Sequence, residues 1–124
     1  MEKTCILVVD DEQTVRLLVR RFLSDKFAVL EASDGEEAVD MARKHKPALI
    51  LMDILMPNVD GYSACYAIKT DEATKAIPVV MLTAVGYELN KKLAETLGAD
   101  GYITKPFTLE KLLDTIGEFL EIPK

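Results

Sequence analysis

Three uninterrupted apolar runs constrain the fold of this chain more than any other feature. They are CILVV (5–9), ALILM (48–52) and PVVML (78–82). Runs without alternation of polar and apolar residues are typical of parallel strands that are buried on both faces. AVLEA (28–32) and GYITK (101–105) are more polar, and we expect them to be strands nearer the edges of the same sheet.

The segments between these runs change to a helical period. Apolar residues recur at helical spacing at Val15, Leu18, Val19 and Phe22, and again at Leu109, Leu112, Leu113, Ile116 and Leu120, which places Gly117 inside the last helix. Another helix is predicted to begin at Asp34, with Glu37 three positions on as in a capping box, and a further one to end at Gly98. Strands and helices therefore alternate. This predicts an α/β fold with a doubly wound, five-stranded parallel sheet and helices on both faces.

The bulk composition bounds the size and the partners of such a fold. The 124 residues, 49% of them hydrophobic, suffice for one sizeable core, and the chain stops at EIPK directly after the last predicted helix, so we expect one domain over residues 1–124. The formal charge of −6 disfavours direct binding to nucleic acid or to an anionic membrane. No apolar run approaches the roughly 18 residues that span a bilayer, and no signal peptide is recognisable, so we expect a cytoplasmic protein without membrane insertion.

Charged and hydroxyl side chains stand where the predicted strands end. Asp10 and Asp11 follow the first run, Asp53 the third, Thr83 the fourth, and Lys105 ends the fifth. In open α/β sheets the ligand site lies outside the carboxyl ends of the strands. The sequence therefore predicts that these side chains gather at one rim of the sheet.

The chemistry of this set indicates a cation and a phosphoryl group. Clustered carboxylates repel one another in a partly desolvated cleft, and Lys105 alone cannot compensate three of them. Hard oxygen ligands with few protein contacts suit Mg²⁺, which commonly completes its shell with water and phosphate oxygens. Phosphoryl transfer needs such a metal, a nucleophile and a countercharge. Asp53 is the natural nucleophile, because it stands alone at the end of a central strand, whereas Asp10 and Asp11 are paired as ligands would be.

Four motifs together resemble the receiver domain of two-component response regulators over the whole chain. They are VVDDE (8–12), LILMDILMPNVDG (49–61), VVMLTA (79–84) and GADGYITKPF (98–107). Each motif is weak alone, but their order and spacing are highly specific. The resemblance implies a flavodoxin-like strand order of 2-1-3-4-5. It also implies that the peptide bond before Pro106 is cis.

The resemblance assigns a role to each residue of the rim. Asp10, Asp11 and Asp53 would hold Mg²⁺, with the backbone carbonyl of Leu55 as a further ligand. Asp53 would accept a phosphoryl group from the phosphohistidine of a histidine kinase or a histidine phosphotransfer protein.

Two further residues would take part in the conformational change that follows phosphorylation. Thr83 would bind the phosphoryl oxygens together with Lys105, and Tyr102 would move inward on phosphorylation. The resemblance places the output on the face of the fourth helix, fifth strand and fifth helix. Because no other domain is expected in the chain, the output would be protein contact, either relay of the phosphoryl group or control of a separate partner.

Three other functions are weighed against this one. A phosphohydrolase that forms an aspartyl phosphate would carry Asp-x-Asp after the first strand, whereas this chain has an adjacent pair and places Asp53 after the third. A flavin site would need hydroxyl and glycine residues in the first loop, where two aspartates would repel phosphate. A constitutive scaffold needs none of the site residues, yet all of them are intact.

Two apolar positions bear on how long a phosphoryl group would persist. Leu55 and Val85 stand two residues after Asp53 and Thr83, where polar groups of chemotaxis receivers can help to orient the hydrolytic water. We therefore expect slow self-dephosphorylation.

Overall fold

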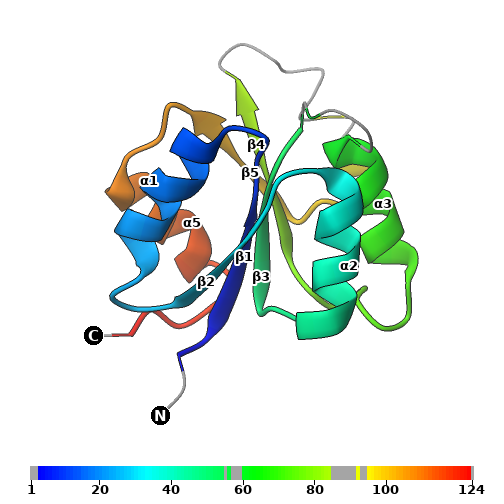
Figure 1. The fold of residues 1–124 in the computed structure, drawn as a ribbon, viewed down its shortest axis with the longest axis horizontal. Helices are drawn as coiled ribbons and strands as arrows, with labels where there is room; N and C mark the ends of the chain where they lie inside the picture. The colour runs from blue at the N-terminus through cyan, green and yellow to red at the C-terminus, as the bar shows by residue number, and fades with distance from the viewer. Residues whose placement is uncertain (1–2, 55, 57–59, 85–91, 93–94, 124) are drawn as a thin grey trace.

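The computed structural model describes residues 3–54, 56, 60–84, 92 and 95–123, and Figure 1 shows their arrangement. The sheet has the order β2-β1-β3-β4-β5, and every neighbouring pair is parallel. Its strands are β1 (Cys5–Val9), β2 (Ala28–Ala32), β3 (Leu49–Asp53), β4 (Val79–Ala84) and β5 (Gly101–Lys105). The predicted fold class and strand order are confirmed, and the two more polar strands, β2 and β5, form the edges.

Helices cover both faces of the sheet. They are α1 (Gln13–Leu23), α2 (Gly35–His45), α3 (Gly61–Thr70) and α5 (Leu109–Gly117). Figure 1 shows α1 and α5 against one face and α2 and α3 against the other. Of the predicted fourth helix the structure describes the end, where Gly98 has a φ of 96° and its N–H donates to the Glu95 carbonyl. Across the described residues, none of the helices combines the length and the apolar character needed to cross a bilayer.

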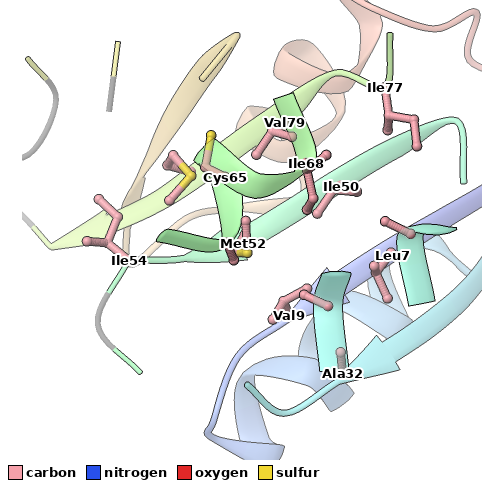
Figure 2. Packing of buried hydrophobic residues seen from close by; sticks show 14 residues of the cluster. Leu7, Val9, Ala32, Ile50, Met52, Ile54, Cys65, Ile68, Ile77 and Val79 are labelled. Atoms are coloured by element: carbon pink, nitrogen blue, oxygen red, sulfur yellow. The ribbon is translucent and has the colours of Figure 1, made fainter. Parts of the chain in front are cut away.

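Each inner strand divides its side chains between two core clusters, one on each face. The cluster under α2 and α3 takes Leu7, Val9, Ile50, Met52, Val79 and Met81 from the strands, and Figure 2 shows part of it. The cluster under α1 and α5 takes the alternate residues Ile6, Val8, Leu49, Leu51, Val80 and Leu82 of these strands, and Ile103 of the edge strand β5. Successive side chains of a strand point to opposite faces, so an unbroken apolar run supplies both clusters. Burial on both faces holds the ends of β1 and β3 in place.

The start of α2 confirms the predicted cap with one change in geometry. The Asp34 carboxylate accepts a hydrogen bond from the Glu37 N–H at 2.8 Å. The Glu37 carboxylate reaches back to the N–H of Ser33 at 2.9 Å, one residue earlier than in a standard capping box.

The bounds of three elements differ from those predicted. The third strand starts and ends one residue later than predicted and so includes Asp53, and the fourth runs to Ala84. The last helix ends at Gly117 instead of continuing to Leu120, so Gly117 is its final residue and not an interior one. The chain then turns and packs the Phe119 ring 3.5 Å from where a Cβ of Gly101 would lie. Leu120 matches the helical period, but it lies after the helix and is partly buried against the cluster under α1 and α5.

Gly61 lets α3 pack its backbone directly against the end of β3. The Gly61 N–H donates to the Ile54 carbonyl at 2.9 Å. A Cβ at this position would overlap the carbonyl oxygen of Asp53 and lie 2.8 Å from the Ile54 Cα. The preceding residue, Asp60, caps the helix by accepting from the Ser63 N–H. The glycine thus allows the close approach that positions the backbone of Asp53.

We predict that Gly61→Ala lowers the free energy of unfolding by about 2 kcal/mol or more, because backbone atoms must shift to admit the methyl group. Urea unfolding measures this. Gly117→Ala is the matched control, since its Cβ would meet Ile122 at an ordinary 3.7 Å. The control should stay within about 1 kcal/mol of the parent. Equal stability of the two variants would contradict the close approach.

Candidate functional site

Asp10 is the most tightly held carboxylate of the predicted rim. It directly follows β1 and is fully buried. Its Oδ1 accepts from the Glu12 N–H at 2.9 Å, and its Oδ2 accepts from Lys105 Nζ at 2.9 Å. Its own N–H donates to the Ala32 carbonyl of β2 at 3.1 Å. These hydrogen bonds therefore fix the orientation of the Asp10 carboxylate.

Lys105 joins this carboxylate to Asp53. Asp53 ends β3 and is 8% exposed, and its Oδ1 lies 3.3 Å from Lys105 Nζ. The lysine ends β5, 95 positions along the chain from Asp10. The structure thus brings together Asp10, Asp53 and Lys105 at the carboxyl ends of three strands, as the sequence predicted.

Asp11 and Glu12 add exposed negative charge at the same place. Carboxylate oxygens of Asp10, Asp11 and Glu12 all lie within 4.8 Å of one another. Asp11 was a predicted metal ligand, whereas Glu12 was not assigned to the site. The sequence signal for Glu12 is its position directly after Asp10 and Asp11. Three consecutive acidic residues in a loop keep their carboxylates close together.

The pKa values of the rim reflect this crowding. Burial, and then the charge of Asp10, raise the pKa of Asp53 to about 6, although the neighbouring Lys105 acts in the opposite direction. Burial alone would lower the pKa of Lys105, but its hydrogen bond to Asp10 and the charge of Asp53 outweigh burial and raise it. The site therefore carries more negative charge than one lysine neutralises.

The two predicted switch residues lie on one face of adjoining strands. Thr83 of β4 is buried, and Tyr102 of β5 is 37% exposed. Tyr102 pairs in register with Met81, two residues before Thr83, so Thr83 and Tyr102 point to the same side of the sheet. Leu55 and Val85, for which a ligand carbonyl and an effect on hydrolysis were predicted, lie outside the described residues.

The donor set fits a hard divalent cation. The acidic loop offers carboxylate oxygens, and Asp53 adds another at the end of β3. Burial and then the charge of Asp10 raise the pKa of Asp53, so a nearby cation would stabilise its ionised form. Oxygen ligands from few residues suit Mg²⁺, which retains several waters. Asp10 directly follows β1 and Asp53 ends β3, so the buried strands limit how far these two carboxylates can move.

Comparison with known families agrees with this geometry. A model of the response regulator receiver domain matches residues 6–117. The chain belongs to this family. Receiver domains are phosphoacceptor modules of two-component systems that interact with histidine kinases, and they are not enzymes in the usual sense. The resemblance inferred from the four motifs is confirmed, and the bond between Lys105 and Pro106 is cis as it implied.

Similar proteins include both short and long chains. The chemotaxis protein CheY of Halobacterium salinarum is 41% identical over 116 residues, covering 93% of this chain and 95% of that one. The transcriptional regulatory protein ResD of Bacillus subtilis is 42% identical over 107 residues, covering 86% of this chain but only 43% of ResD. The chain thus spans nearly all of the first and less than half of the second.

A solved structure bears on the metal. The receiver domain of the sensor histidine kinase PA1611 of Pseudomonas aeruginosa superposes with a TM-score of 0.87 and 28% identity, over 94% of this chain and 97% of that one. That crystal structure has a magnesium ion coordinated in its active site cleft.

We predict that Asp53→Asn raises stability at neutral pH in the absence of metal. A folded-state pKa of about 6 means that ionised Asp53 disfavours the folded state. Removing the charge should therefore add about 1 to 3 kcal/mol at about pH 8. Below about pH 6 Asp53 becomes neutral in the parent as well, so the advantage should shrink as the pH falls toward 5.

Urea unfolding across this pH range measures the difference. Asp25→Asn removes a carboxylate at an exposed position and is the control, which should stay within about 0.5 kcal/mol of the parent. A stability gain that is independent of pH, or a loss at about pH 8, would show that the folded state does not disfavour ionised Asp53.

Proposed function

We propose that this chain accepts a phosphoryl group on Asp53 from the phosphohistidine of a histidine kinase or a histidine phosphotransfer protein, and that the modification controls binding to a partner protein. The observation that carries the proposal is the position of Lys105 Nζ, within reach of the carboxylates of both Asp10 and Asp53. An ammonium group held among carboxylates at the rim can neutralise the oxygens of an incoming phosphoryl group. We also propose that residues 1–124 act as one receiver domain.

The transfer uses groups that the rim holds in place. An Asp53 carboxylate oxygen attacks phosphorus, and the bond between phosphorus and the histidine nitrogen breaks. The electron pair stays on the imidazole nitrogen, and an acyl phosphate forms on Asp53. Lys105 and the Thr83 hydroxyl would bind the phosphoryl oxygens, which carry the charge of the transferred group.

Asp10, Asp11 and Asp53 would hold Mg²⁺, with the Leu55 carbonyl as a further ligand. When bound, the ion would neutralise the carboxylates and the phosphoryl oxygens, so that anionic donor and anionic site can meet. Because Asp53 has a pKa of about 6, it is largely ionised at neutral pH and remains available as the nucleophile.

An apolar hollow beside the rim is the proposed docking site for the phosphodonor. It has a volume of about 370 Å³ and is lined by Glu12, Val15, Leu18, Lys105, Pro106 and Phe107. Leu18 is 40% exposed on α1. Since Lys105 both lines the hollow and lies 3.3 Å from the Asp53 carboxylate, a protein seated there would have its phosphohistidine close to the acceptor.

The output surface is proposed to be the face of the fourth helix, β5 and α5. Tyr102 is partly exposed on β5 and lies on the same side of the sheet as Thr83. A movement of Thr83 toward the phosphoryl group can therefore change the position of the Tyr102 side chain. Hydrolysis of the acyl phosphate is proposed to be slow, because Leu55 and Val85 offer no polar group to orient water.

We predict that incubation with acetyl phosphate and Mg²⁺ adds one phosphoryl group to the chain, as measured by intact mass. Asp53→Asn should abolish the gain, and chelation of the metal should prevent it. After removal of the donor, the modified mass should persist when it is followed over time. No gain under any condition would favour a constitutive scaffold, and a rapid loss would contradict slow hydrolysis only.

We predict that Leu18→Glu slows transfer from a phosphorylated histidine phosphotransfer protein by about tenfold, because it places a charge in the apolar hollow. Its phosphorylation by acetyl phosphate should match the parent, since that donor needs no docking surface. Tyr66→Glu changes an exposed residue of α3 and is the control. Equal slowing of phosphotransfer in the two variants would argue against this docking site. Equal slowing of Leu18→Glu with both donors would argue against it as well.

A further inference from the structure

Arg16 of α1 makes a contact with the main chain of the acidic loop. Its Nη1 donates a hydrogen bond to the carbonyl oxygen of Asp10. Its Nε donates to Glu31 Oε1 of β2 at 3.0 Å, and its side chain is only 16% exposed. One guanidinium thus bridges the loop after β1 to the neighbouring edge strand.

Glu31 also pairs with a second arginine, on its other carboxylate oxygen. Its Oε2 accepts from Arg20 Nε at 2.8 Å, while Arg20 Nη2 donates to the Val29 carbonyl at 3.0 Å. Burial opposes ionisation of Glu31, but the hydrogen bonds and charges of Arg20 and Arg16 outweigh it and lower the pKa of this carboxyl. Glu31 therefore remains a charged acceptor that orients Arg16.

The carbonyl that Arg16 holds belongs to the peptide group between Asp10 and Asp11. A peptide group is planar, so turning it moves the bonds to the flanking residues on both sides. The Asp10 side chain is held separately by the Glu12 N–H and by Lys105 Nζ. Arg16 instead contacts the peptide group itself, through the Asp10 carbonyl oxygen. By holding this peptide group, Arg16 sets the directions in which the side chains of Asp10 and Asp11 leave the main chain.

We propose that Arg16, oriented by Glu31, is a positioning residue that holds the Asp10–Asp11 peptide in the orientation needed to bind a divalent cation. This inference rests on the proposed metal-dependent phosphorylation. Neither arginine is expected to touch the cation or the phosphoryl group. Outer contacts of this kind commonly change metal affinity by about 10- to 100-fold when they are removed.

The charge of Arg16 acts in the opposite direction to its positioning role. A positive side chain near the carboxylates repels a cation, so loss of the charge alone would strengthen Mg²⁺ binding. Loss of positioning would weaken it. The sign of the change therefore separates the two effects.

The chain supplies a matched control. Arg20 has the same charge and pairs with the same carboxylate, but its other hydrogen bond goes to Val29 and not to Asp10. Arg20→Gln removes an equal charge and one ion pair of Glu31 while leaving the loop contact in place. Arg16→Lys keeps the charge but replaces the planar fork with a single ammonium, which cannot hold both partners in the same geometry.

Calorimetric titration with Mg²⁺, without a phosphodonor, tests the proposal on the parent, Arg16→Gln, Arg16→Lys and Arg20→Gln. Both Arg16 variants should bind about tenfold more weakly than the parent, and Arg20→Gln should bind as tightly or slightly more tightly. Urea unfolding of each variant shows whether the fold is retained. Unchanged or tighter binding by Arg16→Gln, or equal weakening by Arg20→Gln, would overturn the proposal.

Hydrogen exchange supplies a readout that needs no metal. The Glu12 amide donates to Asp10 Oδ1, so it reports the geometry of the loop directly. Its exchange should be faster in Arg16→Gln than in Arg20→Gln, and equal rates would overturn the positioning role. If the parent bound no Mg²⁺ while exchange still distinguished the variants, the proposed function would fail and the positioning of the loop by Arg16 would stand.

Discussion

Repulsion among carboxylates at the ends of β1 and β3 is the constraint on which the site depends. Asp10 and Asp53 are both buried, and one lysine from β5 reaches both of them. Ionic groups in such a place are costly unless other charges and hydrogen bonds compensate them. The raised pKa of Asp53 is the measurable sign that compensation is incomplete. A bound cation would supply the missing positive charge, whereas a phosphoryl group on Asp53 would add negative charge for the cation and Lys105 to neutralise.

The sheet makes this arrangement possible by holding the charged ends rigidly. β1 and β3 are central strands whose apolar side chains fill clusters on both faces. A close-packed interior resists small displacements, so the strand ends cannot move apart to relieve the repulsion. Gly61 extends this rigidity to the next element, because α3 begins directly against the backbone of Asp53. The stability of the fold thus offsets the cost of the site.

The helix that follows the acidic loop has two roles on two of its sides. One side carries Arg16 and Arg20, which join it to Glu31 and tie the loop to β2. Another carries Leu18 at the apolar hollow beside Lys105. The same short helix therefore adjoins both the acidic loop and the surface proposed for the phosphodonor. A partner that displaced α1 would disturb both, which links docking to the geometry of the carboxylates.

Sequence pattern alone is enough to predict the strands, their order along the chain and the residues of the rim. Unbroken apolar runs indicate strands buried on both faces, and the rule that ligands lie at the carboxyl ends of parallel strands then selects Asp10, Asp53 and Lys105. Tertiary packing alone accounts for the early end of α5, the close approach at Gly61 and the bridge from Arg16 to Glu31. Periodicity describes which face a residue occupies within its own element. It does not describe how far a side chain reaches across strands, or where a turn and not a helix packs an apolar residue against the core.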